Sequence, residues 1–272
     1  MKLKFLGTAA YEGIPALFCN CDVCRKSREL GGRNMRSRSQ ALVDEDLLLD
    51  FPADTLWHTH RFGLDWQKIR YCLITHDHSD HLYPEDAIQA DPAFTHGHNG
   101  LHFYSAQAGY DHLNNKLGDS TKKLIKISLV EAGKKFTAGD YEVLPLWADH
   151  DSSSSPVFYS IRKGNKKLLY AHDTGWFPDA SWDLLKKEGG VFDLISLDCT
   201  GGLVGGGWTR GHMGLETNLK VIERLRDEKL IDDKTVIVAN HFTHNANTYD
   251  ELIVEGKKHG VIISYDGMEM DF

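Results

Sequence analysis

The chain contains 272 residues, of which 41% are hydrophobic and 26% are charged, and its formal net charge is −8. That length is enough for one large domain or two small ones without disulfides, and the acidic balance excludes a general electrostatic surface for nucleic acid. Because no apolar run reaches membrane-spanning length and the first residues show no signal-peptide core, we expect a cytoplasmic protein.

Short β-rich runs alternate with helical runs along the chain, without a low-complexity linker or a repeat. The sequence predicts strands at residues 2–7, 41–50, 71–75, 101–105, 141–146, 157–162, 167–171, 193–198, 235–239 and 261–263. It predicts helices at residues 53–62, 84–89, 106–117, 181–188, 213–227 and 249–258. The fifth helix carries apolar residues at helical spacing, namely Leu215, Leu219, Ile222 and Leu225. This stripe predicts a helix that packs against a sheet.

Each half of the chain carries strands followed by helices, and this order predicts the fold class. We expect an α/β fold with four layers, αββα, in which two mixed sheets pack face to face with helices outside. A doubly wound sheet would give a similar alternation, but the hairpin turn at residues 163–165 favours mixed over parallel pairing. We expect residues 1–272 to form a single domain, with a cysteine-rich knuckle at about residues 18–25.

The segment 75–81 places three imidazoles and two carboxylates directly after an apolar run that is predicted to be a strand. Imidazole and carboxylate are the side chains that bind zinc, manganese or iron. His76 and His78 are two residues apart and can bind one metal, whereas Asp80 and His81 can reach a second. A polar loop with solvated histidines is the plainer alternative, but four candidate ligands with H-x-H-x-D-H spacing favour a metal site.

Three further candidate ligands stand just past predicted strands: His150, Asp173 and His241. A lone histidine in such a position is more often a surface or core residue. The repetition of the arrangement is what favours a shared site, because strand ends on one rim of a sandwich converge in space.

In order and spacing these seven residues resemble the dinuclear site of the metallo-β-lactamase-fold hydrolases. Within that superfamily the chain is most similar to the phosphodiesterases that accompany carbon–phosphorus lyase and open phosphoribosyl 1,2-cyclic phosphate. The more specific marks are residues 18–24, 172–175, 211–214, 241–244 and 265–268. The aspartate of the Asp80-His81 pair is also informative, because the β-lactam hydrolases of the superfamily usually lack the full pair.

The resemblance implies two divalent ions, zinc, manganese or iron, and a metal-bound hydroxide that attacks phosphorus. It assigns one ion to His76, His78 and His150, and the other to Asp80, His81 and His241, with Asp173 as the bridge. It also implies a catalytic role for Asp80, a small phosphate ester as the substrate, and a homodimer.

Two residues before the fifth helix are further candidates. His212 is implied by the resemblance to contact the phosphate or to protonate the leaving oxygen, although a histidine at a helix start can also be merely solvated. Arg210 could bind phosphate through its guanidinium group, and a plain surface arginine is an equal alternative. The glycine-rich run 201–207 lacks the G-K-[ST] of a nucleotide loop and is interpreted as a border of the pocket.

Cys19, Cys21 and Cys24 have C-x-C-x-x-C spacing, which favours a closed structural zinc in a cytoplasmic chain. The resemblance supplies His244 as the fourth ligand. By contrast, His96, His98 and His102 have no carboxylate partner in the pattern, so we do not predict them to be ligands.

Two other functions remain open. The tRNA 3′-processing nucleases share the ligand set, but the chain shows no projecting arm or basic surface to bind RNA. A relative that takes part in pyrroloquinoline quinone biosynthesis shares the cysteine motif, but it departs from the dinuclear pattern that this chain keeps.

Overall fold

The computed structural model describes residues 1–205 and 208–272, which form two seven-stranded sheets. The strands of the first sheet run in the order β14 (Glu269–Asp271), β1 (Lys2–Gly7), β2 (Gln40–Val43), β3 (Leu47–Leu49), β4 (Tyr71–Leu73), β5 (Leu101–Ser105) and β6 (Ile125–Leu129). Those of the second run in the order β13 (Ile262–Ile263), β12 (Val236–Asn240), β11 (Leu194–Asp198), β10 (Lys166–Ala171), β9 (Val157–Lys163), β8 (Tyr141–Trp147) and β7 (Phe136–Ala138).

Both sheets are mixed, as predicted. In the first sheet the strands from β14 to β3 pair antiparallel and those from β3 to β6 pair parallel. In the second sheet the strands from β7 to β10 pair antiparallel and those from β10 to β13 pair parallel. The predicted turn at 163–165 is the β9–β10 hairpin, in which Lys163 pairs with Lys166 and Gly164 adopts a φ of 59°.

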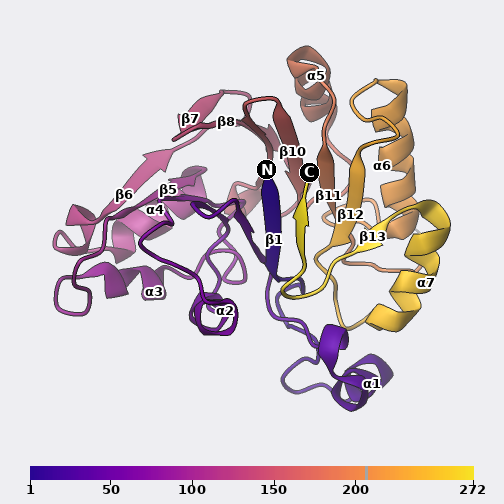
Figure 1. Ribbon diagram of the computed structural model, residues 1–272, viewed down its shortest axis with the longest axis horizontal. Helices are drawn as coiled ribbons and strands as arrows, with labels where there is room; N and C mark the ends of the chain where they lie inside the picture. Colours follow the sequence, from indigo (N-terminus) through magenta and orange to yellow (C-terminus); the bar gives the residue numbers. More distant parts are fainter. Residues whose placement is uncertain (206–207) are drawn as a thin grey trace.

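The described part of the chain contains seven α-helices: α1 (Asp22–Leu30), α2 (Thr55–Phe62), α3 (Pro84–Ala87), α4 (Gln107–Lys116), α5 (Asp179–Glu188), α6 (Leu215–Asp227) and α7 (Tyr249–His259). Helices α2, α3 and α4 lie on the side of the first sheet, whereas α5, α6 and α7 lie on the side of the second (Figure 1). The predicted αββα arrangement is therefore confirmed.

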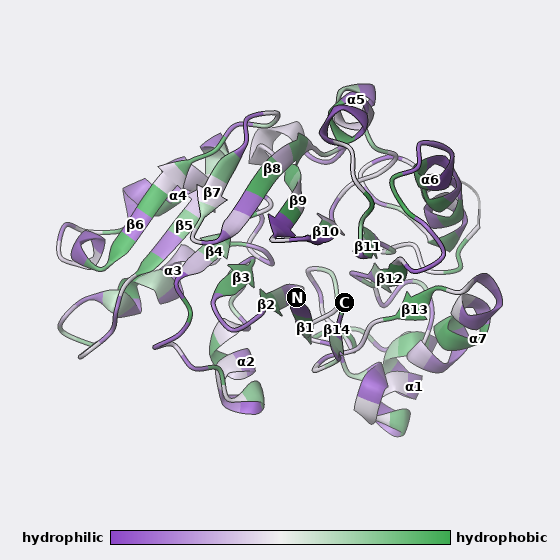
Figure 2. Ribbon diagram, turned by 45° about the horizontal axis from the view of Figure 1, so that its top comes forward, coloured by the Kyte–Doolittle hydropathy of each residue, from purple (hydrophilic) through white to green (hydrophobic). Residues whose placement is uncertain are grey.

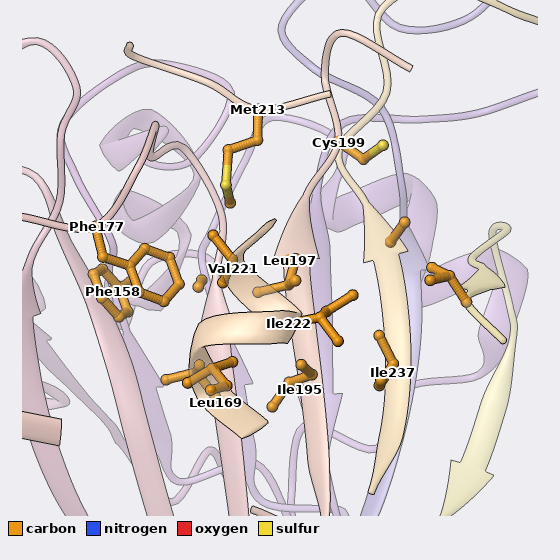
Figure 3. Packing of buried hydrophobic residues seen from close by; sticks show 14 of the residues in the cluster. Phe158, Leu169, Phe177, Ile195, Leu197, Cys199, Met213, Val221, Ile222 and Ile237 are labelled. Carbon is orange, nitrogen blue, oxygen red and sulfur yellow. The ribbon is translucent and has the colours of Figure 1, made fainter. Parts of the chain in front are cut away.

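Three buried clusters hold these layers together. The first lies between the sheets and joins Leu3, Phe5 and Leu73 to Tyr159 and Tyr170. The second packs the outer face of β9–β12 against the helices, with the Val221 and Ile222 side chains of α6 among the strand residues (Figure 3). The third lies under α2–α4. Hydrophobic residues accordingly run along the strands of both sheets, whereas the helices carry both hydrophobic and hydrophilic residues (Figure 2).

The structure differs from the predicted elements in five places. The strand expected at 41–50 is two strands, because the polar segment 44–46 forms a turn in which Asp44 has a φ of 50°. Helix α1 directly follows Cys21, where only a knuckle was expected. Strands β6 and β7 were not predicted. Strand β14 was also missed, because its charged residues show no strand pattern until they pair with β1. No helix in the described ranges is both long and apolar enough to cross a membrane.

Candidate metal centre

The parallel strands of both sheets end at one edge, and the predicted ligands follow those ends. His76, His78, Asp80 and His81 come after β4, Asp173 after β10, and His241 directly after β12. His150 follows β8. We call these seven residues the His–Asp cluster. The structure brings all seven together, and their donor atoms form overlapping groups in which the atoms lie within 4.8 Å of one another.

The first group contains His76, His78 and His150. His150 Nε2 lies 3.2 Å from His78 Nδ1. On the far side of its ring, His150 Nδ1 donates to the carbonyl oxygen of Gly211 at 2.9 Å. A proton held at Nδ1 leaves the Nε2 lone pair of His150 directed at the group, as is usual for an imidazole that binds a metal.

The second group contains Asp80, His81 and His241. The Nε2 atoms of His81 and His241 lie 3.2 Å apart. His81 Nδ1 donates to the Asp50 carboxylate at 2.7 Å, and His241 Nδ1 lies 2.8 Å from the Thr200 hydroxyl. These outer partners fix both rings with their Nε2 atoms directed toward the same point.

Asp173 lies between the two groups. Its Oδ2 atom is 2.9 Å from His81 Nε2 and 3.0 Å from His241 Nε2, and its Oδ1 atom is 3.8 Å from His150 Nε2. Burial alone would raise the pKa of this carboxyl, but His241 and His81 hold the pKa well below its usual range. Asp173 is therefore an anion with one oxygen toward each group.

The donor atoms of the cluster fit divalent metal ions. Within the described part of the chain, His76 Nε2 is buried without a hydrogen-bond partner, although buried polar atoms are nearly always paired. Imidazole nitrogens and carboxylate oxygens of this kind are the ligands of zinc, manganese and iron. A metal ion would satisfy His76 Nε2, which the protein itself leaves unpaired.

The backbone at the cluster is strained. Asp50, Asp173 and His241 leave their strands with φ values of 67°, 50° and 65°. Residues other than glycine rarely adopt this left-handed region, and such conformations persist where the surrounding structure enforces them, often at functional sites.

His212 lies beside the cluster, with its ring centroid 4.8 Å from that of His150. Its Nδ1 atom is 3.0 Å from the Asp198 carboxylate and 3.2 Å from the Thr200 hydroxyl. Burial opposes protonation, but the charge and hydrogen bond of Asp198 raise the pKa of His212 to about 9. The Nδ1 proton is thus held by Asp198, and Nε2 is the atom available for proton transfer.

Asp50 and Asp198 are functional candidates that the sequence reasoning missed. Both are fully buried, and each accepts several hydrogen bonds: Asp50 from Thr75 and His81, Asp198 from the backbone of Asp173, Thr200 and Met213. Each is the last residue of a predicted strand. A carboxylate at such a strand end, one strand away from a predicted ligand, is the signal that could have found them.

The structure does not bring the predicted Arg210 into the site. Its side chain is 84% exposed and its Nε atom donates to Asp149 at 2.7 Å. Arg210 is not among the described residues that line the cavity beside the His–Asp cluster, a space of about 620 Å³ whose walls include His78, His150 and His212. His96 and His98 border a different, largely apolar cavity under α2 and α3, and His102 is bonded to Ser128 on β6.

The three cysteines and His244 also meet, and we call these four residues the cysteine knuckle. Their donor atoms lie within 4.8 Å of one another, and Cys21 Sγ is 3.5 Å from His244 Nδ1. Burial raises the pKa of the Cys21 thiol, but the hydrogen bond to His244 contributes to a net lowering to about 6. Three thiols and one imidazole fit a closed tetrahedral zinc site.

Comparisons with known proteins identify the family. The family model described as "Beta-lactamase superfamily domain" matches residues 48–232. Exodeoxyribonuclease WalJ of Streptococcus pneumoniae serotype 2 is 29% identical over 158 residues, which cover 57% of this chain and 53% of that protein. The chain thus spans about half the length of this curated relative.

Solved structures with the same fold cover the whole chain. A diphosphatase from the PhnP family has a TM-score of 0.74 and 21% identity, with 100% of this chain and 96% of that chain covered. Zinc-bound PqqB from Methylobacterium extorquens has a TM-score of 0.75 and 19% identity, with 100% of both chains covered. At such identities the likeness concerns the fold.

Proposed function

The chain belongs to the β-lactamase superfamily and is a metal-dependent hydrolase of that fold, and from this premise we propose that it is a phosphodiesterase acting on a small cyclic phosphate. The observation that carries the proposal is the position of Asp173, an anionic carboxylate between two groups of ligands. The sequence resemblance makes phosphoribosyl 1,2-cyclic phosphate the first such ester to assay.

In this proposal His76, His78 and His150 hold one divalent ion, Asp80, His81 and His241 hold the other, and Asp173 contacts both. Such ions would supply an activated water and would neutralise the charge that develops on the phosphate. The metals that the ligands accept include zinc, manganese and iron.

The residues of the chain would orient the ligand imidazoles and protonate the leaving oxygen. Asp50, Thr200 and the Gly211 carbonyl each hold the outer nitrogen of one ligand imidazole, so the inner nitrogens point to the centre. His212, held at Nδ1 by Asp198, would donate a proton from Nε2 to the leaving oxygen. Asp198 is thereby a positioning residue.

The test is turnover by the purified protein loaded with zinc or manganese. We expect hydrolysis of bis(p-nitrophenyl) phosphate and of a ribose cyclic phosphate, and we expect chelation to abolish it. Asp183 is exposed on α5, so Asp183→Ala should remain active. This variant is the matched control for the loss of the Asp173 carboxylate. Cleavage of a thioester or lactone without any cleavage of phosphodiesters would contradict the proposal.

A nuclease is the second candidate, because the relative WalJ is named an exodeoxyribonuclease. The net charge of −8 disfavours it, since nucleic-acid binding depends on basic residues that neutralise phosphates. Degradation of single-stranded DNA or of structured RNA at moderate salt would support this candidate against the first.

The cysteine knuckle is proposed to hold a structural zinc. The proposal is supported by its four donors, which are of the type and number that closed zinc sites use. Metal analysis should find one zinc per chain that resists mild chelation. Its absence from freshly purified protein would show the proposal to be wrong.

A further inference from the structure

We propose that the chain has a second ligand site, which binds a phosphate group in a cavity of the first sheet away from the His–Asp cluster. This cavity has a volume of about 430 Å³ and shares no described lining residue with the cavity beside the cluster. The ligand is inorganic phosphate or a small molecule that carries a phosphate group. The inference is independent of the proposed function, because it involves none of the residues assigned to the metal ions.

Parallel pairing places this cavity at the end of the sheet opposite to the metal ligands. Arg70 immediately precedes β4, Gly100 immediately precedes β5, and Lys123 lies two residues before β6. All three residues line the cavity, and the strands from β4 to β6 pair parallel. The ligands at residues 76–81, by contrast, follow the carboxyl end of β4. Strand β4 therefore separates the two sites.

The register of the strands builds one wall of the cavity. Tyr71 of β4 pairs with His102 of β5, and His102 pairs with Lys126 of β6. Paired residues point to the same face of a sheet, as do residues two apart in one strand. Tyr104, two residues after His102, belongs to the buried cluster between the sheets. The phenol, the imidazole and the ammonium group thus form a row on the inner face of the sheet.

The cavity gathers positive charge in an acidic protein. Arg70, Lys123 and Lys126 line it, and its described lining contains neither aspartate nor glutamate. The chain as a whole has a net charge of −8, so carboxylates are more numerous than cations. Like charges that lie close together repel one another and destabilise the folded state. An anion bound between the three side chains would offset this repulsion.

The three cations have no partner among the described residues. Two residues before Arg70, by contrast, Lys68 lies 3.0 Å from the Glu45 carboxylate. Asp46 accepts the backbone N–H of Arg70 through its carbonyl oxygen, but its carboxylate accepts the Tyr141 hydroxyl at 2.6 Å. The guanidinium group and the two ammonium groups therefore keep their donors for a ligand.

The other polar groups of the wall are neutral. His102 Nε2 lies 2.8 Å from the Ser128 hydroxyl, and its Nδ1 atom lies 3.2 Å from the Tyr104 hydroxyl. Burial and the charge of Lys126 lower the pKa of His102, so the imidazole is uncharged at neutral pH. The positive charge of the site thus comes from the arginine and the two lysines alone.

A phosphate group matches these donors in charge and in geometry. A phosphate monoester carries a charge of about −1.5 to −2 at neutral pH and offers three acceptor oxygens. Arg70 can donate two parallel hydrogen bonds to such a group, whereas lysine ammonium groups act as point charges. A carboxylate has only one negative charge and would leave two of the three cations without a counter-charge. The volume of about 430 Å³ also leaves room for a sugar-sized group.

The first experiment titrates the zinc-loaded protein with inorganic phosphate, with ribose 5-phosphate and with acetate at constant ionic strength. The readout is the amide signals of Gly100 and Gly139, two lining residues, in ¹H–¹⁵N NMR spectra. We expect both phosphates, but not acetate, to shift these signals in a saturable manner. Tighter binding of ribose 5-phosphate would identify an organic phosphate as the ligand, and equal affinities would identify the phosphate group alone. Shifts confined to residues around the His–Asp cluster would overturn the inference.

The second experiment removes the charges one at a time. Arg70→Gln and Lys126→Gln should each weaken phosphate binding at this site by about tenfold, the size expected for a hydrogen bond to a charged group. Arg70→Lys keeps the charge and should weaken it less. Lys220→Gln is the control, because Lys220 is 56% exposed on α6 and outside the described lining.

Turnover separates this inference from the proposed function. Without added phosphate, both glutamine variants should hydrolyse bis(p-nitrophenyl) phosphate as fast as the wild type, because neither residue belongs to the metal centre. A protein that hydrolysed no phosphodiester would still bind phosphate at this site if the inference holds. An unchanged phosphate affinity of the Gly100 and Gly139 signals in both glutamine variants would overturn it.

Discussion

The two candidate metal sites of this chain are built in opposite ways. The His–Asp cluster takes its seven ligands from four chain segments that follow strands of both sheets. The cysteine knuckle takes three of its four ligands from six consecutive residues at the start of α1, and only His244 is distant in sequence. The geometry of the first therefore depends on the packing of the sandwich, whereas that of the second depends on one turn and one loop.

The two sites also differ in the residues that surround their ligands. In the cluster, imidazoles are oriented by Asp50, Thr200 and the Gly211 carbonyl, all from other elements. In the knuckle, the contacts are mainly among the ligands themselves, such as Cys21 with His244. The comparison teaches that an open catalytic site needs outer partners to hold it, whereas a closed thiolate site is held largely by its own metal. The sites meet in the loop that carries both His241 and His244.

The largest effect is expected for Asp173→Ala. Loss of the carboxylate between the two groups of ligands should abolish turnover and lower the metal content of the cluster, but not that of the knuckle. Turnover with each substrate and metal analysis of the purified variant would measure this. Near wild-type turnover with both catalytic ions bound would contradict the assignment of the bridge.

His212→Ala should lower kcat by about 10²–10⁴-fold, the usual contribution of a general acid, with metal content unchanged. The loss should be smaller for esters of p-nitrophenol, because a good leaving group needs less protonation. His259→Ala, on the exposed end of α7, is the control. An equal loss for good and poor leaving groups would instead indicate that His212 binds the phosphate.

Asp50→Asn should weaken the affinity of the cluster for metal by about 10–100-fold, because Asp50 fixes the ring of His81. Among the described contacts of the knuckle, no carboxylate lies as close to a ligand as Asp50 does to His81, at 2.7 Å. The affinity of the knuckle for zinc should therefore not change. Titration with a chelator of known affinity would distinguish the two sites. An unchanged affinity would mean that outer partners do not distinguish the sites.

Cys21→Ser should release the knuckle zinc and lower the melting temperature, with a smaller loss of turnover than Asp50→Asn causes. A structural zinc contributes directly to folding, and each 1 kcal/mol lost shifts the melting temperature of a chain of this size by about 2–4 °C. Calorimetry and metal analysis would measure both effects. Some loss of metal from the His–Asp cluster is also expected, because His241 and His244 lie on the same loop. An unchanged melting temperature would contradict a structural role for the knuckle zinc.

The smallest effect is expected for Arg210→Ala. The side chain is exposed and paired with Asp149, so kcat/KM should not change measurably, although the residue was a predicted phosphate ligand. The measurement is steady-state kinetics with the same cyclic phosphates. A clear rise in KM would restore the phosphate contact and would require the loop to move toward the cavity.

Much of the fold could be predicted because its signals are local. Period-two and helical patterns located ten strands and six helices, and the hairpin at Gly164 predicted mixed pairing, which is confirmed. Strand β14 was missed because its residues become a strand only by pairing with β1, where Lys2 lies opposite Asp271. Because this pair joins residues that are far apart in the sequence, a short stretch of sequence cannot reveal it.

The sequence by itself determined which donors the protein carries: the H-x-H-x-D-H segment, the later His150, Asp173 and His241, and the cysteine spacing. Residue type and spacing are enough for this, because metal preference depends on the chemistry of the donor. Only the tertiary structure decided how they are used. Parallel register places Asp198 beside Asn240 and so brings its carboxylate under His212, and the β3–β4 pairing sets Asp50 against His81. It also turned Arg210 out to solvent, because contacts between strand ends distant in sequence exist only once the two sheets have packed.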